Sequence, residues 1–459
     1  MTANGNKMNY KPRETFTSSL GTIAATLGSA IGLGNIWKFP ALTGENGGAA
    51  FLFIYLFCVV FIGLPVMLAE FIIGRKTRSN AIGAFKKLEP KKPWFLVGWM
   101  GVLSSILILA FYTTVVGWIL AYIFKALSGS LSGIDANGAV AVFEKVTANP
   151  VSAVLWQLAV FALISLIIMA GVQKGIERIT KTLLPLLFVL LLICDIRALT
   201  LPGAKEGLSF LFNPDFSKVT GMVVLIAMGL SFFKLSIGMG TMLTYGSYMQ
   251  DEDNMLATAG RVVIADTVVS LMAGMAVFPA VFAFGFEPAS GPPLLFFTIP
   301  MVFNSMPLGQ VFLVLFFVLA FIATIGAMIS MLEVPVAFMH EEWGLKRNTA
   351  VIVTVLVIAS VGSLATLSGS ILSHVLILGK NFFDLFDFTA SNILMPLGGL
   401  IIAVYTGWKI RYKDIQEELS NRGAIEQENM IRLFSLIVRY ITPIAILIIM
   451  LNGLGIIKF

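Results

Sequence analysis

Long apolar runs recur along the whole chain. A run of about 20 apolar residues is long enough to cross the hydrocarbon core of a bilayer as a helix. The 459-residue chain contains eleven such runs, at about 17–42, 49–74, 95–126, 152–170, 177–199, 220–249, 258–285, 309–339, 349–369, 372–406 and 433–457. Because 58% of the residues are hydrophobic and only 12% are charged, the chain is predicted to be an all-α polytopic membrane protein.

The basic residues indicate how the spans are oriented. The opening segment 1–16 lacks the apolar core of a signal peptide, so we expect it to be cytoplasmic. The loops that then face the cytoplasm hold most of the Lys and Arg, seven of them between 75 and 92, as the positive-inside rule requires. The odd number of spans places the C-terminus outside the cell membrane. The net charge of +6 is explained by these loops and predicts no nucleic-acid partner.

Several kinds of chemistry find no support in the sequence. Cys58 and Cys194 both lie in apolar runs and indicate no disulfide framework. His340 and His374 are far apart in the sequence, without other metal ligands nearby. We expect no cofactor, no metal site and no enzymatic activity, because no nucleophile and base constellation is evident. A channel would need a continuous polar lining, whereas the polar residues of the spans cluster at one depth.

The first span contains the motif GSAIGLGNIWKFP at 28–40. Its glycines are poor helix formers, and free backbone groups in a membrane must face a protein cavity. One interpretation is a broken helix whose backbone binds a polar ligand; the other is close packing of helices through small residues. Asn35 and Lys38 in the same span favour the binding site, since polar residues are rare inside membranes.

The sixth span repeats this feature. It reads SFFKLSIGMG at 231–240, with two glycines after a lysine. Two interrupted spans five apart indicate two five-helix repeats of opposite topology with a site between them. The predicted segments are a cytoplasmic segment 1–16, repeats 17–199 and 220–406 around an outer loop 200–219, a cytoplasmic loop 407–432, and an eleventh span 433–459. The apolar stretch 286–308 is expected to fold back over an external vestibule.

These motifs resemble the signatures of the neurotransmitter:sodium symporter family, most closely its bacterial eleven-span amino-acid transporters. GSAIGLGNIWKFP is followed by ENGGAAF at 45–51, and the sixth span continues as FFKLSIGMGTMLTYGSY at 232–248. The resemblance extends over about residues 13–407. It implies the five-plus-five inverted-repeat transporter fold with unwound helices 1 and 6, and transport of an amino acid by alternating access.

The resemblance also implies a substrate site. Its members by position are Ala30, Leu33, Gly34, Ile108, Tyr112, Phe233, Ser236, Met239, Ala327 and Met331. The amides near Leu33 and Gly34 would hold the carboxylate of the amino acid, as free amides at a helix N-terminus do, and Tyr112 would donate to it. The pocket of Ile, Phe and two Met predicts a neutral, hydrophobic L-amino acid.

Two gates follow from the same resemblance. The outer gate pairs Lys38 with Asp387, and Asp384 also matches the family pattern. The lysine takes the place of the family's arginine and cannot make its planar two-point contact. The inner gate consists of Arg13, Glu341, Tyr248 and Ser247. The alternative for the inner pair is ordinary solvated charge beside the membrane.

The first sodium site of the family is altered here. Asn35 and the Ala30 carbonyl remain, but Lys234 stands where the family has threonine and Asp266 where it has asparagine. The Lys234 ammonium is a tethered monovalent cation with three donors. We expect it to replace the sodium ion, with Asp266 as its counter-ion and the substrate carboxylate within reach. The alternative is a lysine stem packed in the core whose head turns to water.

The second sodium site has lost side-chain ligands. Gly28, Ile31 and Ala323 can offer carbonyls, but Gly326 and Ala327 stand where the family has hydroxyl residues. The chloride site of animal members keeps Tyr55 and Ser270, yet Leu230 replaces its glutamine, which argues against chloride. We therefore expect transport that is sodium-independent or weakly sodium-dependent. A sodium-coupled symporter that uses the remaining carbonyls stays open, as do proton coupling, exchange and the oligomeric state.

Overall fold

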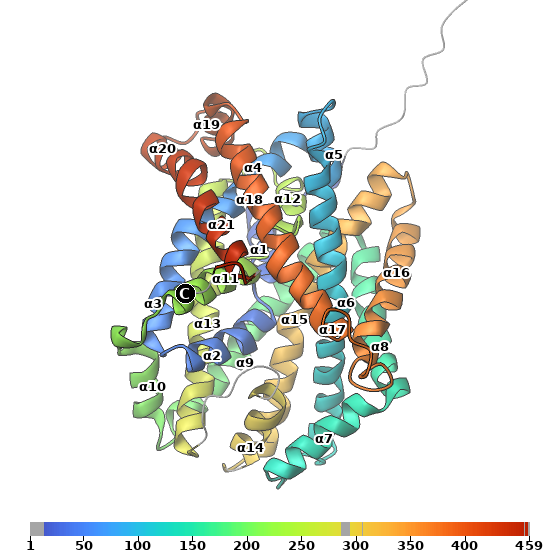
Figure 1. The fold of residues 1–459 in the computed structure, drawn as a ribbon, viewed down its shortest axis with the longest axis vertical. Helices are drawn as coiled ribbons and strands as arrows, with labels where there is room; N and C mark the ends of the chain where they lie inside the picture. The colour runs from blue at the N-terminus through green and yellow to red at the C-terminus, as the bar shows by residue number, and fades with distance from the viewer. Residues whose placement is uncertain (1–12, 286–293, 305, 454, 458–459) are drawn as a thin grey trace, which may run out of the picture.

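A computed structural model describes residues 13–285, 294–304, 306–453 and 455–457, and the described chain is a bundle of helices (Figure 1). The first half comprises α1 (Ser19–Ala30), η1 (Gly34–Lys38), α2 (Phe39–Glu45), α3 (Ala49–Cys58), η2 (Val59–Gly63), α4 (Leu64–Thr77), α5 (Ala81–Leu88), α6 (Phe95–Leu127), α7 (Ala136–Ala148), α8 (Pro150–Met169), η3 (Val172–Glu177), α9 (Arg178–Leu199) and α10 (Ala204–Phe212). The second half comprises η4 (Phe216–Lys218), α11 (Gly221–Lys234), α12 (Thr241–Gly246), α13 (Met255–Ala283), η5 (Leu294–Thr298), α14 (Ile299–Asn304), α15 (Gly309–Glu342), α16 (Arg347–Leu367), α17 (Phe382–Phe388), η6 (Thr389–Leu394), α18 (Met395–Trp408), α19 (Tyr412–Leu419), α20 (Glu428–Leu436), η7 (Ile437–Ile441) and α21 (Thr442–Gly453).

The long helices agree with the predicted spans. Within the described residues, nine helices are long and apolar enough to cross a membrane, and the bent pair of α1 and η1 with α2 makes a tenth. The remaining predicted span is the pair α11 and α12, whose halves are too short to cross singly. The chain is therefore a multi-pass helical membrane protein. The helix of the tenth span begins at Phe382 rather than near 372, because residues 368–381 form turns and one bridge.

The first break separates α1 from η1 at residues 31–33, and the two halves meet at an angle of 51°. Close approach explains the glycines beside it. A Cβ at Gly32 would lie 2.8 Å from the Tyr112 hydroxyl, and a Cβ at Gly34 would lie 3.0 Å from Cγ of Lys234. The break is thus a consequence of packing side chains against bare backbone.

The second break separates α11 from α12 at residues 235–240. Three residues there have positive φ, namely Ser236, Gly238 and Gly240. The amides that the break frees are bound by the buried carboxylate of Glu70 on α4, which accepts from Gly238 N at 2.6 Å and from Leu243 N at 3.1 Å. These side-chain oxygens satisfy donors that lipid could not. This role of Glu70 was not predicted from the sequence.

The stretch expected to fold back is described in part. Residues 286–293 lie outside the described residues, whereas η5 and α14 are helical. The Phe296 ring packs against Tyr122 of α6 at 4.9 Å and near Phe317 of α15 at 6.3 Å between centroids. The segment therefore lies against two spans, at the end of the bundle that also carries α7 (Figure 1).

Candidate substrate and ion site

A small cavity of about 20 Å³ lies between the two breaks. Its lining residues are Ser29, Ala30, Gly32, Gly34, Ile108, Tyr112, Phe233, Lys234, Ser236, Met239, Ala327 and Met331. All the predicted substrate residues except Leu33 line this cavity. Lys234, which was predicted to reach the substrate carboxylate, lines it as well, whereas Ser29 and Gly32 were not predicted. The lining comes from α1 with its break, α6, α11 with its break, and α15.

Tyr112 connects α6 to the first break. Its hydroxyl accepts a hydrogen bond from the Leu33 amide at 3.0 Å, and its side chain is buried. Leu33 thus touches the site through its backbone, although its side chain does not line the cavity. On the opposite side, the Ser236 hydroxyl donates to the Ser29 carbonyl at 2.9 Å. Hydrogen bonds therefore hold both breaks to the walls of the cavity.

Lys234 lies at the C-terminal end of α11, and its side chain is fully buried. Its ammonium is 3.0 Å from Oδ2 of Asp266 on α13 and donates to the Tyr55 hydroxyl at 2.8 Å and to the Ser270 hydroxyl. It also lies 5.1 Å from the ring centroid of Phe39. Its three donors thus meet three acceptors, and the ammonium does not turn to water.

Asn35 joins this ion pair to the first break. Its Nδ2 donates to Oδ1 of Asp266 at 2.6 Å and to Ser270 at 3.1 Å, while its Oδ1 accepts from the Gly32 amide at 3.1 Å. The buried charges of Lys234 and Asp266 are therefore both paired and hydrogen-bonded, as charges inside a protein must be. A contact between the Lys234 ammonium and a substrate carboxylate stays a prediction.

The second ion position is mostly apolar. A cavity of about 10 Å³ there is lined by Gly28, Ile31, Thr180, Leu183, Leu184, Leu187, Ile322, Ala323 and Gly326. A Cβ at Gly326 would lie only 2.3 Å from the carbonyl oxygen of Gly28. The backbones of α1 and α15 therefore touch where the resemblance places a hydroxyl ligand. Ala327 lines the substrate cavity rather than this one.

The two predicted residues of the outer gate are apart. No ion pair joins Lys38 to Asp387 in the part of the chain that the structure describes. The Lys38 ammonium lies 4.1 Å from the ring centroid of Phe233, and Asp387 accepts from Ser391 at 2.8 Å. Asn381 caps α17: its Oδ1 accepts from the Asp384 amide at 2.8 Å, and its Nδ2 donates to the Asp384 carboxylate at 2.8 Å.

A further cavity lies beside the residues predicted for the outer gate. It has a volume of about 230 Å³, and Lys38, Phe233 and Ser391 are among its lining residues.

The end that is predicted to be the inner one is held by ion pairs. Arg13 pairs with Glu341, and its guanidinium lies 4.8 Å from the ring centroid of Tyr248. The Tyr248 hydroxyl donates to the buried Glu333 at 2.7 Å, and Glu333 pairs with Arg347 at 2.7 Å. The fourth predicted member, Ser247, donates to the carbonyl of Thr244 within its own segment.

Glu333 and Arg347 were not predicted. A charged residue inside a predicted span is rare enough that Glu333 and Glu70 could have been found from the sequence.

Comparison with known proteins gives consistent results. The family model described as the sodium:neurotransmitter symporter family matches residues 13–142 and 137–458. A protein of Bacillus subtilis named uncharacterized sodium-dependent transporter YhdH is 42% identical over 97% of this chain and 98% of its own length. An uncharacterized sodium-dependent transporter of Haemophilus influenzae is 35% identical over 97% and 99% of the two chains.

A solved structure is also similar. The crystal structure of MhsT in complex with L-phenylalanine is 44% identical and superposes with a TM-score of 0.88, covering 96% of this chain and all of that one. The chain therefore shares the fold of MhsT, and two interrupted helices lie at its centre.

Proposed function

Because the chain belongs to the sodium:neurotransmitter symporter family, and is a membrane transporter rather than an enzyme, we propose that it carries neutral hydrophobic L-amino acids by alternating access. The observation that carries this proposal is the cavity between the two helix breaks. One side offers backbone groups and the Tyr112 hydroxyl, and the other offers apolar side chains such as Ile108 and Met331. A site of this kind suits a zwitterion with an apolar side chain.

The binding roles follow from the chemistry of the lining. The Leu33 amide and the Tyr112 hydroxyl, which bond each other at 3.0 Å, would turn to the carboxylate of the substrate. The carbonyl of Ala30 and the hydroxyl of Ser236 would receive its amine. Met239 and Met331 would contact its side chain and adapt to several shapes. The crystal structure of the similar transporter MhsT with L-phenylalanine supports this class of substrate.

We further propose that transport is sodium-independent or only weakly sodium-dependent. The Lys234 ammonium is bound by Asp266 at 3.0 Å, so a positive charge is already fixed near the first ion position and would repel a sodium ion. At the second position the side chains of the lining are apolar except for Thr180, and Gly326 is in contact with Gly28. Both observations support coupling that does not rest on sodium.

The second candidate is a sodium-coupled symporter that uses carbonyls of Gly28, Ile31 and Ala323. Sodium prefers oxygen ligands, and three remain at this position. This candidate is favoured by the names of two relatives. The proteins from Bacillus subtilis and Haemophilus influenzae are both called sodium-dependent transporters. The two proposals differ in a single measurable property, which is the response of uptake to sodium.

Uptake into proteoliposomes tests both parts of the proposal. Labelled leucine is offered with a sodium or a choline gradient, and each of the twenty amino acids is added as competitor. We expect saturable uptake and counterflow in both salts, with competition by leucine, methionine and phenylalanine. Competition by lysine or glutamate alone would contradict the substrate class, and uptake only with sodium would contradict sodium independence. Liposomes without protein are the control, and counterflow separates a carrier from a channel.

A further inference from the structure

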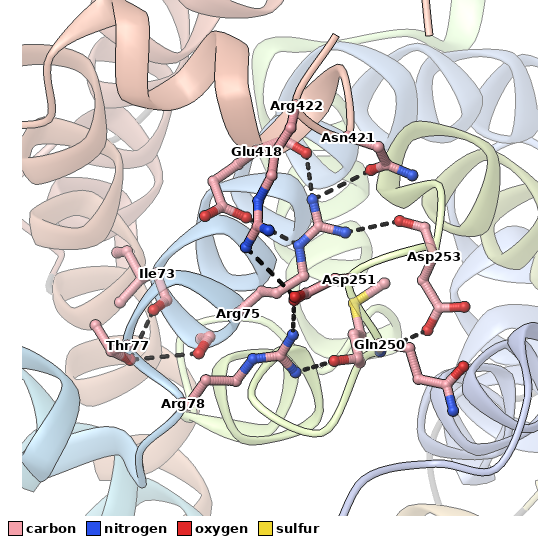
Figure 2. A network of polar contacts seen from close by, with 12 residues as sticks. Ile73, Arg75, Thr77, Arg78, Gln250, Asp251, Asp253, Glu418, Asn421 and Arg422 are labelled. Atoms are coloured by element: carbon pink, nitrogen blue, oxygen red, sulfur yellow. Dashed lines mark hydrogen bonds and ion pairs between the residues drawn. The ribbon is translucent and has the colours of Figure 1, made fainter. Parts of the chain in front are cut away.

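A polar network joins three separate segments at the end of the bundle that is predicted to face the cytoplasm (Figure 2). The segments are the end of α4, the loop 250–254 between α12 and α13, and α19 with the turn 420–423 that follows it. Figure 1 shows α19 at the same end of the molecule as α5 and α12. Neither the substrate cavity nor the two ion positions include any of these residues, so the network needs an explanation of its own.

Arg75 lies at the centre of the network. Its Nε contacts Oε2 of Glu418 at 2.9 Å, its Nη1 donates to the Asp253 carbonyl at 2.7 Å, and its Nη2 donates to the Glu418 carbonyl and to Asn421 at 3.3 Å. The Arg75 side chain is only 3% exposed. A buried guanidinium must find acceptors for its donors, and here the acceptors come from two segments distant in sequence. Arg75 thus fastens α19 to the loop 250–254.

The loop in turn holds the start of α1. The carboxylate of Asp253 accepts from Ser19 at 2.5 Å and from Thr22 at 2.7 Å, and Asp253 is fully buried. Gln250 donates to the carbonyl of Phe16 at 2.8 Å. A continuous chain of charged and hydrogen-bonded groups therefore runs from Glu418 through Arg75 and Asp253 to the first turn of α1, the half-helix that leads to the substrate cavity.

Further contacts hold α19 and its turn in place. Asp414 of α19 pairs with Lys76 of α4 at 3.6 Å. Arg422 pairs with Asp251 at 3.3 Å, and Asp251 also pairs with Arg78. The apolar side of α19 is buried through Ile415 and Leu419.

The backbone of the network is strained. Among the described residues, six other than glycine have positive φ, and three of them are Arg78, Asn421 and Arg422. Such conformations are costly and persist where contacts determine them. Asn421 is fixed on both sides, since its Oδ1 accepts from Arg75 and its Nδ2 donates to the Glu252 carbonyl at 3.0 Å. Release of these contacts would relieve the strain. The turn is therefore suited to a contact that forms and breaks between two conformations.

We propose that residues 412–423 form a cytoplasmic clamp that holds the inner end of α1 closed through Arg75 and Asp253. When the clamp is attached, the loop 250–254 is fixed and α1 stays against it. When Glu418 and Asn421 leave Arg75, the loop is freed and the start of α1 separates from the bundle, which opens the substrate cavity toward the cytoplasm. The clamp biases the equilibrium between two conformations and does not contact the substrate.

The first test measures how often α1 opens. The full-length protein carries Cys58→Ala, Cys194→Ala and the reporter Ala25→Cys, whose position is fully buried on α1. Its rate of modification by a membrane-impermeant thiol reagent is measured from the cytoplasmic side. We expect Glu418→Gln combined with Asn421→Ala to raise this rate at least about fivefold, because the charge and an acceptor of the Arg75 guanidinium are lost. The neighbouring exposed Glu417 provides the matched control Glu417→Gln, which should leave the rate unchanged.

The second test asks whether the clamp must open during transport. In the protein with Cys58→Ala and Cys194→Ala but without the Ala25→Cys reporter, Arg75→Cys and Glu418→Cys are joined by a reducible bifunctional thiosulfonate. We expect the cross-link to abolish uptake of labelled leucine and a reducing agent to restore it. Full uptake with the cross-link in place, or equal modification rates in the clamp variant and in Glu417→Gln, would overturn the proposal. Because the modification rate is read without substrate or sodium, it does not depend on the proposed substrate or coupling.

Discussion

The first and second ion positions of this transporter differ in kind. At the first, the side-chain nitrogen of Lys234 is paired with Asp266 and hydrogen-bonded to Tyr55 and Ser270. At the second, α1 and α15 meet backbone to backbone at Gly28 and Gly326, and apolar side chains surround the carbonyls. In the function proposed above, a side chain takes the place of the ion at the first position, and a direct helix contact takes its place at the second.

This difference shows two ways in which dependence on an ion could be lost. A tethered cation keeps the electrostatics of a bound ion but abolishes its exchange with solvent. A glycine contact removes the need for an ion by letting the helices touch. Transport should therefore respond to changes in side-chain charge at the first position. At the second position it should respond to changes in side-chain volume. The predictions below separate the two, from the largest expected effect to the smallest.

Asp266→Asn should have the largest effect, because it leaves the buried Lys234 ammonium without its counter-charge. Breaking a buried ion pair by removal of one partner costs about 3–5 kcal/mol, and no cation from solution can replace a carboxylate. We expect a large drop in the unfolding temperature of the purified protein and loss of uptake in any salt. Asp215→Asn is the control, since Asp215 is an exposed carboxylate outside the predicted sites that pairs with Lys218 at 4.0 Å. An Asp266→Asn protein as stable as the parent would show that the pair is unimportant.

Lys234→Thr should have a smaller effect that sodium can reverse. The variant leaves the Asp266 carboxylate unpaired, and a sodium ion can bind beside it together with Asn35 and the Ala30 carbonyl. Without sodium we expect substrate affinity to fall by about tenfold or more, equivalent to about 1.4 kcal/mol, and added sodium should restore much of it. Affinity is measured by leucine competition across a sodium series.

The double variant Lys234→Thr with Asp266→Asn tests the same hypothesis with both charges removed. It removes both charges and restores the residue types that the resemblance gives for the family, so its uptake should depend on sodium from the outset. If the parent were already strictly sodium-dependent and Lys234→Thr did not change that dependence, the tethered cation would be excluded as the reason for any coupling behaviour.

Much of the fold followed from the sequence because apolar length and glycine position are local signals. The breaks near Gly32 and Gly238 were predicted from helix-breaking residues inside apolar runs, and the structure has helix ends there. The orientation of individual side chains did not follow. The position of the Lys234 ammonium depends on which of its neighbours offer acceptors, and Tyr55 and Ser270 come from spans that the pattern of apolar residues does not bring together.

The gates illustrate the same limit. Arg13 and Glu341 lie at span ends that the resemblance makes neighbours, and they form an ion pair. Lys38 and Asp387 were predicted by the same reasoning, yet the Lys38 ammonium lies over the ring of Phe233. Whether an outer pair forms depends on the conformation of the transporter, which the sequence alone does not select. The clamp was not predicted from the sequence, because its loops carry charges of both signs without a recognisable motif.

Tyr112→Phe tests the substrate site apart from either ion position. The hydroxyl contacts the Leu33 amide at 3.0 Å and no group of the two ion positions. Loss of a hydrogen bond to a charged carboxylate is worth about 1.5–3 kcal/mol, or about tenfold or more in affinity. We expect weaker leucine binding by this factor at every sodium concentration, with an unfolding temperature close to that of the parent. Unchanged binding would make Tyr112 a packing residue.

Gly326→Ser should have the smallest effect, and its direction tests whether the second position is closed. The added Cβ would lie 2.3 Å from the Gly28 carbonyl oxygen, so α1 and α15 must separate, and overpacking of this kind costs about 1–3 kcal/mol. Gly326→Ala is the matched control, because it adds the same Cβ without the hydroxyl. If the volume of the added side chain determines the effect, both variants unfold at similarly lowered temperatures. Sodium then changes the unfolding temperature of neither variant. If instead sodium raises the unfolding temperature of Gly326→Ser but not of Gly326→Ala, the hydroxyl has completed an ion site. The second position would then be a sodium site that lacks one ligand rather than a closed helix contact.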